Sequence, residues 1–122
     1  MLLNNFFILE NIEILEDQII GKILIDANHD ILKGHFPQQA LVPGVCMLEM
    51  LKELLEKHFD KKLMMTESSV IKFLTMFSIP QFTRATFYID SKILENGNYS
   101  IQASLKHEEH IFLKFKGIFQ EK

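Results

Sequence analysis

The residues of this chain best suited to proton-transfer chemistry are a loop histidine and a glutamate in the apolar segment that follows it. His35 lies in the segment Gly34-His35-Phe36-Pro37, and Glu49 is the one polar residue among residues 45–51. An imidazole exchanges protons near neutral pH, and apolar surroundings raise the pKa of a carboxyl group. The two side chains could therefore act as an acid–base pair if the fold brings them together.

The segment that carries Glu49 is predicted to be a helix from about Pro43 or Gly44 to Phe59. Proline fits the first turn of a helix, where its missing N–H would have had no acceptor. Residues 45–51 point in every direction around a helix, so we expect the N-terminal half to be enclosed, with Cys46 as a small buried hydrophobe. The second half is amphipathic and should meet solvent through its charged residues, which are Lys52, Glu53, Glu56 and Lys57.

The rest of the chain has the signals of β-strands joined by tight turns. Strands are predicted at residues 6–15, 18–27, 69–78, 84–93, 99–106 and 111–119, with a separate short run at 63–66. The Asn96-Gly97 pair predicts a tight hairpin turn, and residues 107–110 predict another. This order of elements predicts a single α+β domain, residues 1–122, with an antiparallel sheet wrapped around one long central helix.

Composition excludes several classes of function. A formal net charge of -3 gives no electrostatic case for binding nucleic acid or an anionic membrane. The single cysteine, Cys46, cannot form an intramolecular disulfide and gives no zinc-binding spacing. The first residues lack the features of a signal peptide, and no apolar run is long enough to cross a bilayer. We therefore expect a cytoplasmic protein with no metal and no cofactor.

The loop and the start of the helix carry a resemblance to a known family. Gly34-His35-Phe36-Pro37, Pro43-Gly44-Val45 and the acid Glu49 resemble, in register, the signature of the 3-hydroxyacyl-[acyl-carrier-protein] dehydratases, which have the hot-dog fold. The chain departs from the signature at Gln38-Gln39-Ala40, where the family usually has Gly-x-Pro. The family's N-terminal Pro-His-Arg-Tyr-Pro segment is also missing.

The resemblance implies a reaction and a set of site residues. A hydro-lyase of this kind eliminates water from a 3-hydroxyacyl thioester to give a trans-2-enoyl thioester, in fatty-acid synthesis or in polyketide or aryl-polyene-type lipid synthesis. His35 would be the catalytic base and Glu49 the catalytic acid. The backbone N–H of Gly44 would donate to the thioester oxygen, and Pro43, Val45 and Phe36 would line the substrate site.

The resemblance also implies partners. The family builds its site across a homodimer, with the histidine from one subunit and the acid from the other, so we expect a homodimer, or a dimer of dimers or higher. The acyl chain would arrive on acyl carrier protein. Because that carrier is acidic, a basic patch is expected at the site entrance, with Lys33, Lys72 and Arg84 as candidates.

Two other functions are compatible with the sequence. A hot-dog thioesterase would hydrolyse the thioester, although such enzymes generally lack the His-Phe-Pro loop. A non-catalytic acyl-binding subunit would explain the altered residues 38–40 but not the presence of both His35 and Glu49. Considered without the flanking motif, each residue has a plainer explanation: His35 would be a structural loop histidine, and Glu49 a helix residue that reaches solvent.

Overall fold

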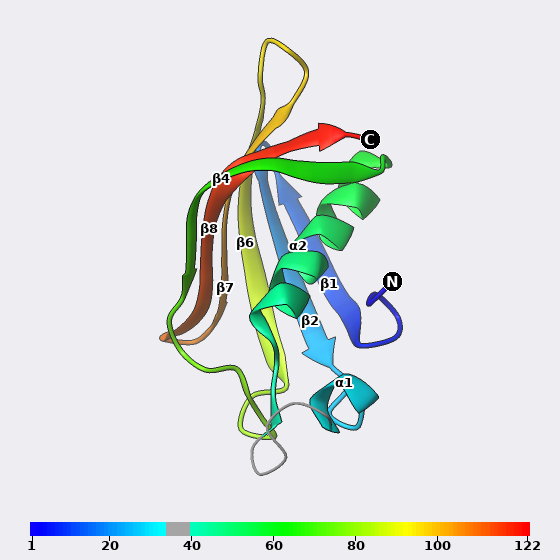
Figure 1. The fold of residues 1–122 in the computed structure, drawn as a ribbon, viewed down its shortest axis with the longest axis vertical. Helices are drawn as coiled ribbons and strands as arrows, with labels where there is room; N and C mark the ends of the chain where they lie inside the picture. The colour runs from blue at the N-terminus through cyan, green and yellow to red at the C-terminus, as the bar shows by residue number, and fades with distance from the viewer. Residues whose placement is uncertain (34–39) are drawn as a thin grey trace.

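The computed structural model describes residues 1–33 and 40–122 (Figure 1). Its helices are α1 (Asp30–Lys33) and α2 (Gly44–Phe59). Its strands are β1 (Phe7–Leu15), β2 (Gln18–Ile25), β3 (Ala40–Leu41), β4 (Leu63–Phe73), β5 (Ser78–Ile79), β6 (Arg84–Ile93), β7 (Tyr99–His107) and β8 (His110–Glu121). Six strands form one sheet in the order β1-β2-β6-β7-β8-β4, and β3 pairs with β5. Figure 1 shows this sheet curving around α2.

Each long strand of the sheet is antiparallel to its neighbours, and tight turns join the hairpins. In the β6–β7 turn, Gly97 has a φ of 88°, which glycine adopts without steric cost. The backbone N–H of Asn98 in the same turn donates to Asn96 Oδ1 at 2.9 Å. The β7–β8 turn falls at residues 108–109. Both predicted turns are confirmed.

Helix α2 has the predicted bounds. It begins directly after Pro43 and ends at Phe59, where Asp60 adopts a left-handed φ of 54° and the N–H of Lys61 donates to Glu56 O at 3.2 Å. The middle of the helix is fully buried through Met50, Leu51, Leu54 and Leu55, each at most 1% exposed. This stripe faces the concave side of the sheet, where Leu54 approaches Gly21 of β2. The helix and the sheet thus share one core.

Several parts of the chain differ from the predicted elements, including the short pair β3 and β5, which was not predicted. Residues 63–73 form one continuous strand rather than two, because β-bulges near residues 65–67 and 68–70 let it bend while it stays paired with β8. That strand ends at Phe73, and residues 74–77 lie outside it. The short helix α1 was not predicted, since four residues give no periodic signal.

The predicted burial of α2 is wrong at three positions. Val45, expected to be enclosed, is 75% exposed, and Cys46, expected to be buried, is only half-buried. Glu53, expected to meet solvent, is 1% exposed, because backbone N–H groups near the N-terminus supply its hydrogen bonds. In the described ranges, neither helix has the length and apolarity needed to cross a membrane.

Candidate active site

An apolar pocket of about 550 Å³ lies at the start of α2. Its walls come from residues 41–45 and Met47 on one side and residues 73–77 on the other, and Thr75 is the one polar residue among them. Three predicted substrate-binding residues, Pro43, Gly44 and Val45, line this pocket. The fourth, Phe36, lies outside the described residues. The pocket has the apolar character that an acyl chain requires.

Hydrogen bonds to neighbouring strands hold the second wall in place. The N–H groups of Leu74 and Thr75 donate to the carbonyls of Phe112 and Ile111, at 3.2 and 2.8 Å. The N–H of Val42 donates to the carbonyl of Phe77 at 2.9 Å, which ties the two walls together. The Phe77 ring stacks on Phe112, with ring centroids 4.2 Å apart. The pocket is therefore built on the rigid sheet.

Phe73, the last residue of β4, closes over the start of the helix. A Cβ atom on Gly44 would lie 2.6 Å from Phe73 Cζ, so the aromatic ring rests directly on the Gly44 backbone. The ring is itself half-exposed, at 49%. Sequence reasoning placed Phe73 only in a strand, because nothing along the chain shows which strand end meets the helix.

The start of α2 offers hydrogen-bond donors to the pocket. Among the described residues no side chain caps this helix, and the residue before it is Pro43, which has no N–H. The N–H groups of Cys46 and Met47 already donate to Pro43 O, at 3.0 and 3.2 Å. The first N–H groups of any helix have no acceptor within the helix and lie at its positive end. The N–H of Gly44, predicted to donate to a thioester oxygen, is at this end of the helix, and so is the N–H of Val45.

Glu49 lies one helical turn after Val45 and on the same face of α2, because residues four apart on a helix are neighbours. Its side chain is 38% exposed, and Oε1 lies 3.2 Å from Lys52 Nζ. Burial raises the pKa of the Glu49 carboxyl, and a hydrogen bond with Glu53 raises it further, whereas Lys52 opposes both effects. Glu49 is not itself one of the residues that line the pocket. The other half of the predicted acid–base pair, His35, lies outside the described residues.

The three basic residues predicted at the site entrance do not converge. Lys33 lies 3.5 Å from Asp30, and Arg84 Nε lies 2.9 Å from Glu10 Oε1, so both already have a carboxylate partner. Arg84 is on β6 and Lys72 is on β4, with β7 and β8 between them. Lys72 instead pairs in register with Lys114 of β8.

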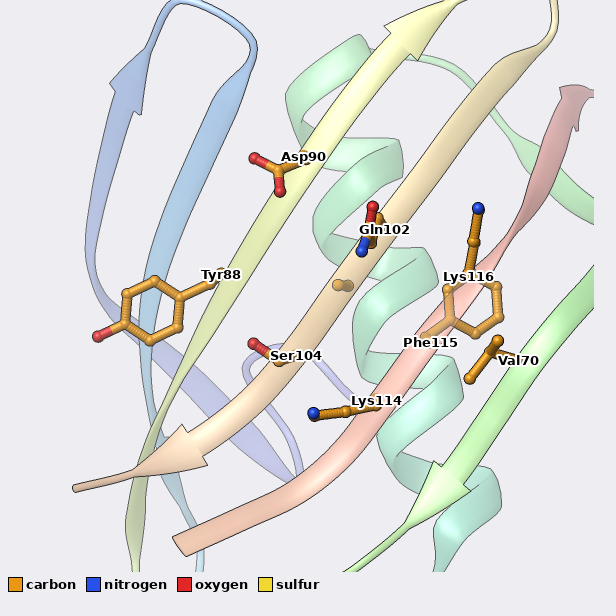
Figure 2. A pocket seen from close by; sticks show the side chains of 9 residues that line it. Val70, Tyr88, Asp90, Gln102, Ser104, Lys114, Phe115 and Lys116 are labelled. Carbon is orange, nitrogen blue, oxygen red and sulfur yellow. The ribbon is translucent and has the colours of Figure 1, made fainter. Parts of the chain in front are cut away.

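The region next to Lys72 contains a second hollow, of about 290 Å³, on the convex face of the sheet (Figure 2). Figure 2 shows Lys114 and Lys116 projecting from this face together with Tyr88, Gln102 and Ser104, while α2 lies behind the sheet. We call Lys72, Lys114 and Lys116 the lysine cluster. None of its lining residues also lines the pocket at the start of α2, so the two hollows are separate.

In the described part of the chain, no group of three or more His, Cys, Asp or Glu side chains is arranged to hold a metal ion. The two histidines of the β7–β8 hairpin each lie beside a glutamate: His107 by Glu108 at 3.6 Å and His110 by Glu109 at 3.4 Å.

Solved structures with the same fold include three proteins of low sequence identity. The dehydratase heterocomplex ApeI:P from Xenorhabdus doucetiae matches with a TM-score of 0.65 and 16% identity, over 93% of this chain and 97% of that chain. An uncharacterised protein from Erwinia carotovora subsp. atroseptica matches with a TM-score of 0.64 and 15% identity, over 92% and 91% of the two chains. The dehydratase domain from the CurF module of curacin polyketide synthase has a TM-score of 0.58 and 20% identity, over 93% of this chain and 43% of that one.

These likenesses confirm the predicted hot-dog fold. A comparison with curated proteins gives no match. The family model for ApeI-like proteins, described as ApeI dehydratase, matches residues 11–84, which is more than half of the chain. That range contains the pocket wall Pro43-Gly44-Val45, the acid Glu49 and the His-Phe-Pro motif. The chain therefore belongs to the ApeI-like family of hot-dog dehydratases.

Proposed function

We propose that the protein eliminates water from a 3-hydroxyacyl thioester carried on acyl carrier protein and releases the trans-2-enoyl thioester, in fatty-acid or polyketide-like lipid synthesis. The observation that carries this proposal is the position of Glu49. It lies one turn from Val45 in the pocket wall, on the helix whose first two residues, Gly44 and Val45, line the same pocket. A carboxyl with a raised pKa thus stands beside a site for an acyl thioester.

The proposed reaction needs three groups. His35 removes the proton from the carbon next to the thioester carbonyl, and the electron pair forms the new double bond. The C–O bond at the next carbon breaks, and Glu49 gives its proton to the leaving hydroxyl, which departs as water. The N–H groups of Gly44 and Val45 stabilise the negative charge that develops on the thioester oxygen. The proton held by His35 then returns to Glu49, and the site is ready for another substrate.

A second copy of the chain would complete this site. Apolar residues around the pocket are exposed in the single chain: Val45, Phe73, Leu74 and Met76 are between 49% and 75% exposed. Strand β4 ends the sheet beside this pocket, so its outer edge is free to pair with another strand. We infer a homodimer in which the partner covers these residues and brings its own His35 to Glu49.

Subunit mixing tests the shared site. His35→Ala and Glu49→Gln proteins are each expected to be inactive. In a mixed dimer both changes fall in one site and the other site is intact, so re-equilibrated mixtures should recover about a quarter of wild-type turnover. Recovery of no activity, with mixed dimers demonstrated by mass spectrometry, would contradict a site shared between subunits.

The reaction itself is tested with two kinds of substrate. Carrier-bound 3-hydroxyacyl thioesters, with short, long and aryl-capped chains, are compared with the same acyl groups on pantetheine, and products are followed by mass spectrometry. Enoyl product that disappears with His35→Ala and with Glu49→Gln supports the dehydratase. Free acid would indicate a thioesterase, and bound acyl chain without turnover would indicate a non-catalytic subunit.

The lysine cluster is the surface that best suits an acidic carrier. No described carboxylate forms an ion pair with Lys72, Lys114 or Lys116. Lys72 also directly precedes Phe73 of the pocket wall. Changing Lys114 and Lys116 to Glu should raise KM for carrier-bound substrate and leave KM for the pantetheine substrate unchanged. Lys57→Glu, on α2 away from this surface, is the matched control.

A further inference from the structure

The one fully buried charged side chain among the described residues is Glu53, one helical turn after Glu49. Its two carboxylate oxygens accept three hydrogen bonds from the N-terminal segment. The N–H of Leu2 donates to Oε1 at 3.0 Å and to Oε2 at 2.9 Å, and the N–H of Leu3 donates to Oε1 at 2.8 Å. Backbone donors stabilise the ionised form of a carboxyl group. Glu53 is therefore built to remain an anion.

The neighbouring carboxyl group has the opposite preference. Glu49 and Glu53 lie four residues apart on one face of the helix, which brings their carboxyl groups within reach of each other, and two carboxyl groups can share a hydrogen bond only if one of them supplies a proton. Backbone N–H groups already occupy both oxygens of Glu53, so the proton belongs on Glu49. Burial alone would raise the pKa of Glu53, but the hydrogen bonds from Leu2, Glu49 and Leu3 outweigh it and lower that pKa.

The other charged or titratable groups that face this pair are few. Lys52 on α2 contacts Glu49, at 3.2 Å, and favours its ionised form. The Cys46 thiol, one turn before Glu49, has a pKa raised by burial and by the Glu49 charge, so the thiol form predominates. Against these groups, Glu53 is the one whose charge pushes the proton onto Glu49.

We propose that Glu53 is a positioning residue, which keeps the catalytic proton on Glu49 and is itself fixed by the backbone of Leu2 and Leu3. This inference rests on the proposed role of Glu49 as the acid. It assigns the N-terminal segment a part in the reaction, because Leu2 and Leu3 hold Glu53 in its ionised form. In the sequence, Leu2 and Leu3 lie far from the predicted motif, which begins at Gly34.

The test compares Glu53→Gln with wild type by two measurements. The first is the titration of glutamate carboxyl carbons by NMR, assigned with Glu49→Gln. In wild type, Glu49 should titrate at a higher pH than Glu53. In Glu53→Gln, the Glu49 midpoint should fall by about one pH unit, because its anionic partner is gone. The second measurement is turnover against pH. A group that must carry a proton works below its pKa, so the alkaline limb of the variant should move to lower pH by the same amount.

The matched control is Glu56→Gln. Glu56 is on the same helix and its Oε2 also accepts a backbone hydrogen bond, from Leu63 at 2.9 Å, but it does not contact Glu49. The Glu56→Gln variant should leave unchanged both the titration midpoint of Glu49 and the alkaline limb of the pH–turnover profile. A wild-type titration in which Glu49 ionises before Glu53 would overturn the proposal, and this measurement does not depend on whether Glu53→Gln folds. An unchanged Glu49 midpoint in folded Glu53→Gln would also overturn it.

The two measurements separate this proposal from the proposed function. The NMR titration locates the proton whether or not the protein turns over a thioester. If wild type gives no enoyl product but Glu49 still titrates above Glu53 and shifts in Glu53→Gln, the dehydratase assignment fails and the coupling stands. If enoyl product forms and neither the midpoint nor the limb moves, the coupling fails and the dehydratase stands.

Discussion

The first turn of α2 and its middle turns have similar apolar side chains in opposite surroundings. Met50, Leu51 and Leu54 are at most 1% exposed, whereas Val45 is 75% exposed and borders an open pocket. Two of the three glutamates of the helix follow the same pattern, since Glu53 is buried among the middle turns and Glu49, nearer the first turn, is 38% exposed. The middle turns hold the fold together. The first turn leaves apolar surface and an acid available for a ligand and a second subunit.

The largest expected effect is the loss of turnover when Glu49, the proposed acid, is replaced. Glu49→Gln should lower turnover by about 10²- to 10⁴-fold, the range in which general acids contribute. The free energy of unfolding should change little, because the side chain is partly exposed and its ion pair with Lys52 is near the surface. Steady-state kinetics and urea unfolding measure the two quantities. A variant that keeps more than a tenth of wild-type turnover would remove Glu49 from the chemistry.

The next effect separates the two regions by stability. Leu51→Ala leaves a cavity in the core and should lower the free energy of unfolding by about 2–5 kcal/mol. Val45→Ala, at the exposed first turn, should change it by no more than about 0.5 kcal/mol. Urea unfolding of both variants below the concentration at which they dimerise makes the comparison. Equal losses at the two positions would mean that the first turn belongs to the core after all.

The pH dependence of stability tests the buried carboxylate. The pKa of Glu53 is lower in the folded protein than its ordinary value, so folding favours the anion. Its contribution is fully present above the ordinary glutamate pKa and is lost as the pH falls through the lowered value. Wild type should therefore be more stable than Glu53→Gln at neutral pH, and the difference should narrow towards acid pH. A difference that does not change with pH would show that packing, rather than charge, is lost.

The smallest expected effect is at the pocket wall. Gly44→Ala requires the Phe73 ring to move, because the new Cβ would lie 2.6 Å from Cζ. The ring is half-exposed and can rotate away, so the free energy of unfolding should change by less than about 1 kcal/mol. The NMR signals of Phe73 should shift, and KM should change while kcat is nearly kept. A large fall in stability would instead mean that the ring is locked in place by its surroundings.

The bounds of the central helix and the hairpin turns could be predicted from local signals. Pro43 before the helix, the change in pattern at Asp60 and the Asn96-Gly97 pair act within a few residues of themselves. The reach of β4 could not be predicted, because its two bulges interrupt the alternation of buried and exposed residues. Pairing with β8, which is distant in sequence, decides that the strand is continuous.

The site could be predicted only in part, for a similar reason. Pro43, Gly44 and Val45 were found from the motif, and the structure places them in one pocket wall. Phe73 and Glu53 were missed, because each owes its place to a contact far along the chain. The ring of Phe73 meets Gly44, and Glu53 accepts hydrogen bonds from Leu2 and Leu3. From the sequence alone, a buried glutamate cannot be told from a surface glutamate, because the backbone N–H groups that donate to it are distant along the chain.

The two ends of strand β4 are fastened to the two ends of helix α2. At one end the N–H of Leu63 donates to Glu56 Oε2, and at the other the Phe73 ring rests on Gly44. An extended strand of this length covers about 33 Å, whereas the helix from Gly44 to Glu56 covers about 18 Å. The excess length has to bow away from the helix, and residues 66–69 are all exposed. The middle of β4 should therefore tolerate an inserted or deleted residue. A change of length at either end would instead displace helix α2 relative to the pocket wall formed by residues 73–77.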